Sequence, residues 1–107
     1  MKMILAVVQA DDATAVVQAI KQAGYRATRI ATEGGWLRHE NVTLLIGVEG
    51  GEVNRVLEIL RRTSQRRTTY INVTAEVTGM FSMQPIEVEV GGATVFVLDV
   101  ERFERLV

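Results

Sequence analysis

Two stretches of the chain carry the same apolar pattern, and this repeat limits the possible folds more than any other feature of the sequence. Five apolar positions of the first stretch recur 40 positions later in the second. They are Val8, Ala13, Val16, Val17 and Ile20 in the first and Val48, Val53, Val56, Leu57 and Leu60 in the second. Each copy has the spacing of a strand followed by an amphipathic helix. A strand-helix unit given twice, with a strand between, predicts an α+β, ferredoxin-like sandwich (βαββαβ) with an antiparallel sheet and both helices on one face.

The first copy has recognisable boundaries. Met3–Val8 is a continuous apolar run, as expected for a central strand. Asp11 or Asp12 is suited to cap the following helix, and Gly24 to end it in a left-handed conformation. From Tyr25 to Thr32 the residues alternate in character, which predicts a strand with one polar face.

The second copy comprises a strand over Val42–Val48 and a helix that begins after Glu52. The sequence after this helix predicts further extended structure. We expect an extended segment over 68–78, an exposed apolar loop over 79–85, an additional C-terminal hairpin of strands 86–90 and 94–100 around Gly91-Gly92, and a short helix over 101–106. Two strands beyond the basic unit leave sheet edges exposed, and a chain this small often covers such edges with copies of itself.

Length and charge bound the class of protein. At 107 residues the chain is predicted to form a single domain, 1–107. Its net charge is −1, with 12 basic and 13 acidic residues, and this lacks the basic excess of a general nucleic-acid binder. The apolar start is too short for a membrane span and has no signal-peptide pattern. We therefore expect a soluble, cytoplasmic protein.

Catalytic and metal-binding motifs are absent from the sequence. There is no cysteine and only one histidine, His39, with no serine or carboxylate beside it in a recognisable pattern. This composition disfavours a transition-metal site and a cysteine nucleophile. No Walker loop or GxGxxG motif is present. The sequence thus predicts neither an enzyme nor a metal site.

The segment around Gly34-Gly35 has the residues of a ligand site. Glycine allows a backbone to approach a ligand closely, and Trp36 beside it offers a stacking surface. Asn41 is suited to read both N6 and N7 of adenine, while Arg26 and Thr28 are suited to bind phosphate. Two interpretations remain open at this point: an adenine-nucleotide site, or a hairpin whose glycines only form its turn.

The sequence resembles the cyclic-di-AMP receptor family of PII-like signal transduction proteins over nearly its whole length. The resemblance is carried by YRAT at 25–28, ATEGGWLR at 31–38, NVT at 41–43, IGV at 46–48 and IEVEVGGATVFV at 86–97. It implies a ferredoxin-like protomer in a bacterial homotrimer that binds cyclic-di-AMP in clefts between subunits. It further implies no cofactor and ligand-dependent loops that contact an unknown downstream protein.

The same resemblance implies a set of ligand-binding residues. They are Arg26, Thr28, Gly35, Trp36, Leu37, Asn41, Gly47, Phe96 and Arg67. Among these, Gly35, Trp36 and Leu37 would form the wall of an adenine pocket, in which the family usually has Phe at the position of Trp36. The chain also departs from the family at Glu40-Asn41-Val42-Thr43, where Gly-Asn-Thr-Thr is common, and at Arg67-Thr68-Thr69, where Arg-Glu-Gln is common.

Two other functions fit the same architecture. One is a PII-like regulator that binds ATP or ADP and acts by docking a loop on a target. The other is a trimeric structural module of the divalent-cation-tolerance type that binds no nucleotide. Nucleotide titration would separate both from a cyclic-di-AMP receptor.

Overall fold

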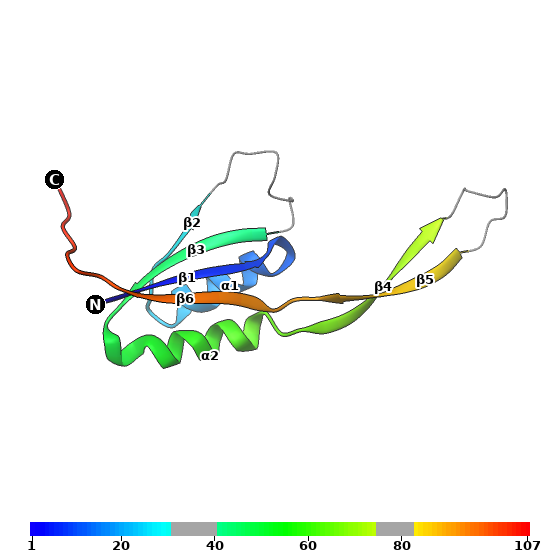
Figure 1. Cartoon of the computed structure of the whole chain (residues 1–107), viewed down its shortest axis with the longest axis horizontal. Coiled ribbons are helices and arrows are strands. Elements are labelled where there is room, and N and C mark those ends of the chain that lie inside the picture. The colour runs from blue at the N-terminus through cyan, green and yellow to red at the C-terminus, as the bar shows by residue number, and fades with distance from the viewer. Residues whose placement is uncertain (31–40, 75–82) are drawn as a thin grey trace.

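The fold is an antiparallel sheet backed by two helices, with a long hairpin that projects from one end (Figure 1). A computed structural model describes residues 1–30, 41–74 and 83–107, and within the hairpin the side chains of 71–74 and 83–86 are not described. The elements are β1 (Lys2–Gln9), α1 (Ala10–Gln22), β2 (Ala27–Ile30), β3 (Asn41–Val48), the 3-10 turn η1 (Gly50–Glu52), α2 (Val53–Thr63), β4 (Arg67–Thr74), β5 (Met83–Val90) and β6 (Ala93–Asp99).

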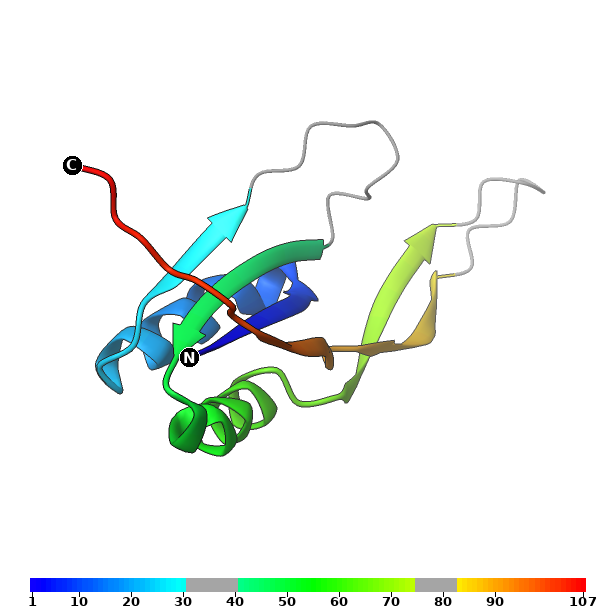
Figure 2. The ribbon, with the colours of Figure 1, turned by 60° about the vertical axis from the view of Figure 1, so that its left-hand side comes forward.

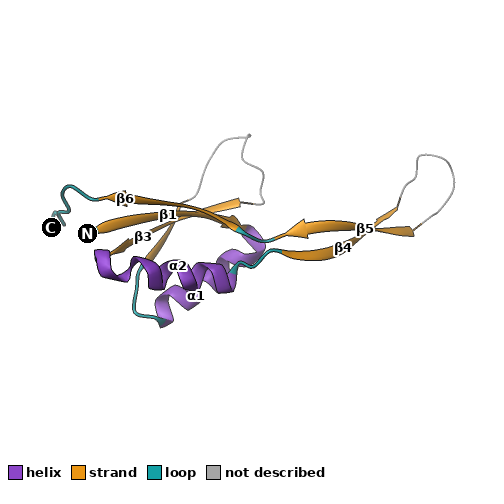
Figure 3. Cartoon of the chain, turned by 60° about the horizontal axis from the view of Figure 1, so that its bottom comes forward, coloured by secondary structure: helices purple, strands orange, loops and turns teal. Residues whose placement is uncertain are grey.

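The main sheet has the strand order β2-β3-β1-β6, and all of its neighbouring strands are antiparallel. This is the order expected of a ferredoxin-like sheet, with β6 in the place of the fourth strand. Both helices lie on the same face of the sheet, as predicted (Figure 3). The repeat in the sequence therefore identified the architecture correctly.

The core lies between the helices and this face of the sheet. Its fully buried side chains come from the alternate positions of β1 and β3 and from the apolar stripes of the helices: Ile4, Ala6, Val8, Val16, Ile20, Leu44, Ile46, Val56 and Leu60. Removing these surfaces from water is the main favourable term in folding. The forty-residue repeat is thus a repeat of core positions.

The ends of α1 agree only in part with the sequence analysis. Gly24 follows the helix with φ +93°, which is the predicted left-handed conformation. The helix begins at Ala10, however, and Gln9 is its N-cap residue with no side-chain capping bond. The prediction that Asp11 or Asp12 caps the helix is wrong, because both lie inside its first turn, where their charge suits the helix dipole.

The C-terminal hairpin was predicted in the wrong place. The strands on either side of Gly91-Gly92 do not pair with each other: β5 pairs with β4, and β6 pairs with β1 in the main sheet. The true hairpin is β4-β5, which extends from the body as an arm and gives the molecule a length of 62 Å (Figures 1 and 2). Met83–Pro85, predicted as loop, belongs to β5, and 75–82 lie outside the described residues.

The final segment is irregular rather than helical. Residues 102–107 have no regular structure and are exposed, and they lead away from the sheet (Figure 2). The predicted helix over 101–106 is therefore wrong. Its apolar residues Phe103 and Leu106 find no core to pack against in this chain, so the periodic pattern has no surface to stabilise it.

Candidate ligand-binding site

Four of the predicted site residues, Thr28, Asn41, Gly47 and Phe96, belong to the face of the sheet opposite the helices, which we call the open face. Successive residues of a strand point to opposite faces of the sheet. Buried positions and their register partners therefore mark the face that packs against the helices, and the residues next to them in sequence mark the open face. One row of register partners crosses the whole open face, from β2 through β3 and β1 to β6. It consists of Thr28, Leu45, Leu5 and Phe96. The sequence pattern predicted that Thr28 and Ile30 share one face of β2. This is confirmed, because their register partners Leu45 and Thr43 both lie on the open face of β3.

The open face is apolar along its centre. Met3, Leu5 and Val7 lie along β1, and Phe96 and Leu98 remain 53% and 48% exposed on β6. Figure 3 shows both helices on the other side of the sheet. An apolar surface of this kind on a small protein commonly marks an interaction site.

The structure spreads these predicted residues widely over the open face. Thr28 and Phe96 lie on opposite edge strands, roughly 14 Å apart when the three strand spacings between them are added. Asn41 begins β3 and Gly47 lies near its end, a separation of roughly 20 Å along an extended strand. Arg26 precedes β2 at the end of the sheet where Gly47 lies. The residues therefore share a face without forming one compact pocket within the chain.

Gly47 is not required by packing within this chain. A Cβ at this position would lie 3.7 Å from the Cε of Met1, which is an ordinary contact. Its exposed backbone therefore has room for a ligand or another chain. The predicted adenine wall of Gly35, Trp36 and Leu37, together with Glu40, lies outside the described residues.

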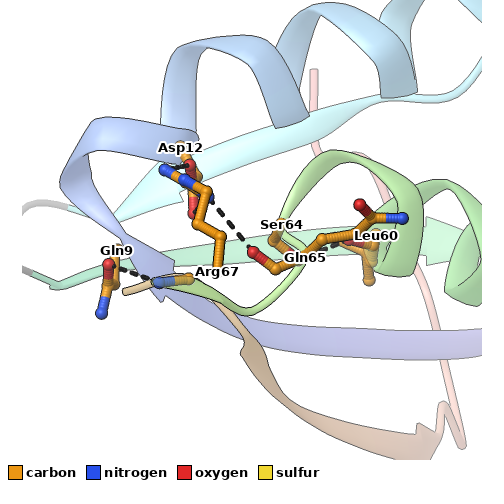
Figure 4. Close-up of polar contacts among 7 residues, drawn as sticks. Gln9, Asp12, Leu60, Ser64, Gln65 and Arg67 are labelled. Carbon is orange, nitrogen blue, oxygen red and sulfur yellow. Dashed lines mark hydrogen bonds and ion pairs between the residues drawn. The ribbon is translucent and has the colours of Figure 1, made fainter. Parts of the chain in front are cut away.

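Arg67 is engaged by a carboxylate at the start of α1 (Figure 4). Its Nη2 donates to Asp12 Oδ1 at 2.8 Å, and its Nη1 donates to the backbone oxygen of Gln65 at 3.2 Å. The Asp12 side chain is only 7% exposed, so this ion pair compensates a nearly buried charge. The hydrogen bond from Arg67 to Asp12 also raises the pKa of Arg67. Arg67 therefore attaches the base of the arm to the body.

A second attachment fixes the other strand of the arm. The backbone N–H of Gly91 donates to Gln9 Oε1 at 2.8 Å. Gly91 has φ +91°, and a Cβ there would lie 2.2 Å from the backbone oxygen of Gln65. Only glycine fits this crossing, because a side chain would overlap the backbone that holds Arg67. Gly91-Gly92 thus form the joint between arm and sheet instead of a hairpin turn.

A polar recess of about 410 Å³ opens beside this joint at one end of the open face. It is lined by Gln9, Asn41, Arg66, Gly91, Gly92 and Thr94, among others. Gln9 and Asn41 are register partners on β1 and β3, and Asn41 is the one predicted residue, among those that the structure describes, that lines the recess. Sequence reasoning missed Gln9, Arg66 and Thr94, since they belong to three separate segments that no local pattern connects.

A larger recess of about 520 Å³ lies between α2 and β6. It is lined by Leu57, Arg61, Arg66 and Val95, among others, and by none of the predicted ligand-binding residues within 1–30, 41–74 and 83–107. The larger of the two recesses therefore does not coincide with the predicted residues on the open face.

Taken together, the chain is an α+β protein of the ferredoxin-like type, with an apolar open face and polar groups at its ends. No helix among the described residues is long and apolar enough to cross a membrane. A family model for the cyclic-di-AMP receptor matches residues 1–106. The chain belongs to the cyclic-di-AMP receptor family.

A solved structure supports the fold independently. The chain is similar to a functionally unknown protein from Pediococcus pentosaceus ATCC 25745, with 38% sequence identity and a TM-score of 0.75. The match covers 98% of this chain and 96% of that protein. A known structure therefore matches nearly the whole length of the chain.

Proposed function

We propose that the protein is a cyclic-di-AMP receptor without catalytic activity, which binds its ligand between subunits of a homotrimer. Membership of the receptor family carries this proposal. The positions of the predicted residues agree with it. Asn41 and Gly47 lie roughly 20 Å apart on one strand, so a single chain does not place both around one base, as a site shared between subunits requires.

The apolar open face supports the subunit arrangement. Phe96 is exposed at the β6 edge, far from Thr28 on β2, so one chain cannot place both around the same base. Packing copies through this face would bury the exposed apolar side chains and bring the β6 edge of one copy toward site residues of another. The ligand would then lie between subunits, and its binding would reshape the long loops that contact a downstream protein.

Titration calorimetry with cyclic-di-AMP, cyclic-di-GMP and ATP tests the function. We expect saturable binding of cyclic-di-AMP and little or none of the other two. Preference for ATP would replace the proposal with a PII-like regulator of linear nucleotides. A melting temperature that no nucleotide raises would favour a structural module, because a ligand that binds the folded state must stabilise it.

Substitution of Asn41 tests the proposed base contact. Asn41→Ala is expected to weaken cyclic-di-AMP binding by roughly 1–3 kcal/mol, the scale of one bidentate contact to a base. Asn54→Ala is a matched control, since Asn54 is also an exposed asparagine but lies on α2, behind the sheet. Equal affinities of the two variants would remove Asn41 from the site.

A further inference from the structure

Arg66 and Arg67 are adjacent in sequence but have different surroundings. Arg67 extends toward α1 and is paired with Asp12. Arg66 lines the polar recess, and a Cβ on Gly92 would lie 3.6 Å from its Cγ and 3.8 Å from its Nε. Neighbouring residues of an extended chain point to opposite sides, which explains the division. Arg66 therefore lies alongside Gly92, at the boundary between this recess and the larger one between α2 and β6, which it also lines.

The orientation of the Gln9 amide makes the recess rich in hydrogen-bond donors. A backbone N–H can only donate, so the bond from Gly91 requires the oxygen of Gln9 to face the joint. The amide NH₂ of Gln9 is then left to donate elsewhere. Thr94 adds a hydroxyl, and Asn41 lies opposite Gln9 on β3. No carboxylate is among the described residues that line the recess, and the nearby Asp12 is already paired with Arg67.

We propose that this recess is a phosphate subsite, in which Arg66 and the Gln9 amide bind a phosphate group of the nucleotide whose base contacts Asn41. An arginine and an outward-facing amide favour an anion over a cation. The inference rests on the proposed function for the identity of the nucleotide. The preference for phosphate is independent of the proposed function, because it follows from the groups that line the recess.

Variants of Arg66 provide the test with the full-length protein. We expect Arg66→Gln to weaken cyclic-di-AMP binding by about 10-fold or more, the scale of one charge-assisted hydrogen bond. Its affinity should also depend less on salt, because an ionic contact is lost. Arg66→Lys should retain most of the affinity. Arg62→Gln, an exposed arginine on α2 outside the recess, is the control and should bind as the unmodified protein does.

A second measurement separates failure of this inference from failure of the proposed function. Inorganic phosphate is titrated into the protein while the NMR amide signals of Gly91 and Gly92 are followed. Selective shifts that vanish in Arg66→Gln support the subsite, even if cyclic-di-AMP itself does not bind. If cyclic-di-AMP binds and Arg66→Gln matches Arg62→Gln, the subsite is refuted and the receptor function stands. Absence of any phosphate-induced shift would also refute it.

Discussion

The joint between arm and body makes a quantitative prediction about Gly91. In Gly91→Ala two costs add: the positive φ of +91° and the overlap of the new Cβ with the Gln65 oxygen at 2.2 Å. A non-glycine residue in such a conformation costs about 1–3 kcal/mol, and overpacking adds about 1–3 kcal/mol. Reduced entropy of the unfolded chain returns about 0.4–1 kcal/mol. We expect a net loss of about 3 kcal/mol in the free energy of unfolding.

Gly24 offers a matched control for the overlap. Its φ is +93°, almost the same as that of Gly91, but nothing lies within 4 Å of a Cβ built there. Gly24→Ala should therefore lose only the conformational part, about 1 kcal/mol. The difference between the two variants, about 2 kcal/mol, isolates the close approach to Gln65.

Thermal and urea unfolding at one fixed protein concentration would measure these losses. A difference of about 2 kcal/mol corresponds to a melting temperature lower by roughly 10 °C for a domain near this size. Fixed concentration matters because subunit association would also stabilise the fold. Equal stabilities of Gly91→Ala and Gly24→Ala would refute the crossing of Gly91 over Gln65 as the reason for glycine at the joint.

Two further predictions concern the open face and the edge of the helix layer. Phe96→Glu should lower the molar mass found by sedimentation, because it places a charge on the apolar face, whereas Tyr70→Glu on the arm should leave the mass unchanged. The hydrogen bond to Glu52 raises the pKa of Tyr25, so the phenol should ionise at lower pH in Glu52→Ala, as followed by phenolate absorbance in a Tyr70→Phe background. The pKa of Tyr25 is higher in the folded chain than in the unfolded chain. The hydrogen bond therefore stabilises the fold fully below the unfolded pKa of about 10, and this stabilisation is lost as pH rises through the folded pKa. An unchanged phenolate titration in Glu52→Ala would contradict the role of Glu52.

The sequence predicted the core well because the core depends on local periodicity. Val16 and Ile20 in α1, and Val56 and Leu60 in α2, lie at helical spacing and are buried as expected. The placement of Thr28 on the same face as its alternate neighbours followed from strand geometry in the same way. Each of these inferences needs only the chain's own period and no knowledge of distant partners.

The hairpin was misplaced because strand partners are not encoded locally. A Gly-Gly pair between two β-branched segments is a strong turn signal, and the residues on both sides do form strands. The same alternation is compatible with any partner strand, however. Here β6 pairs with β1, which lies about as far away in sequence as the chain allows, and the two positive φ angles at Gly91 and Gly92 carry the backbone from one sheet to the other.

The roles of the charged residues depend on contacts that only the fold provides. Asp12 is indistinguishable in sequence from a helix cap, yet its partner is Arg67, 55 positions away. Arg66 and Arg67 are adjacent in sequence, yet Arg67 pairs with Asp12 while Arg66 lines the recesses beside Gly92. Gln9 connects these features, because it holds Gly91 through its oxygen and lies opposite Asn41 in the sheet. The attachment of the arm and the polar end of the open face therefore share a side chain, so a ligand that binds there contacts the same glutamine that positions the arm.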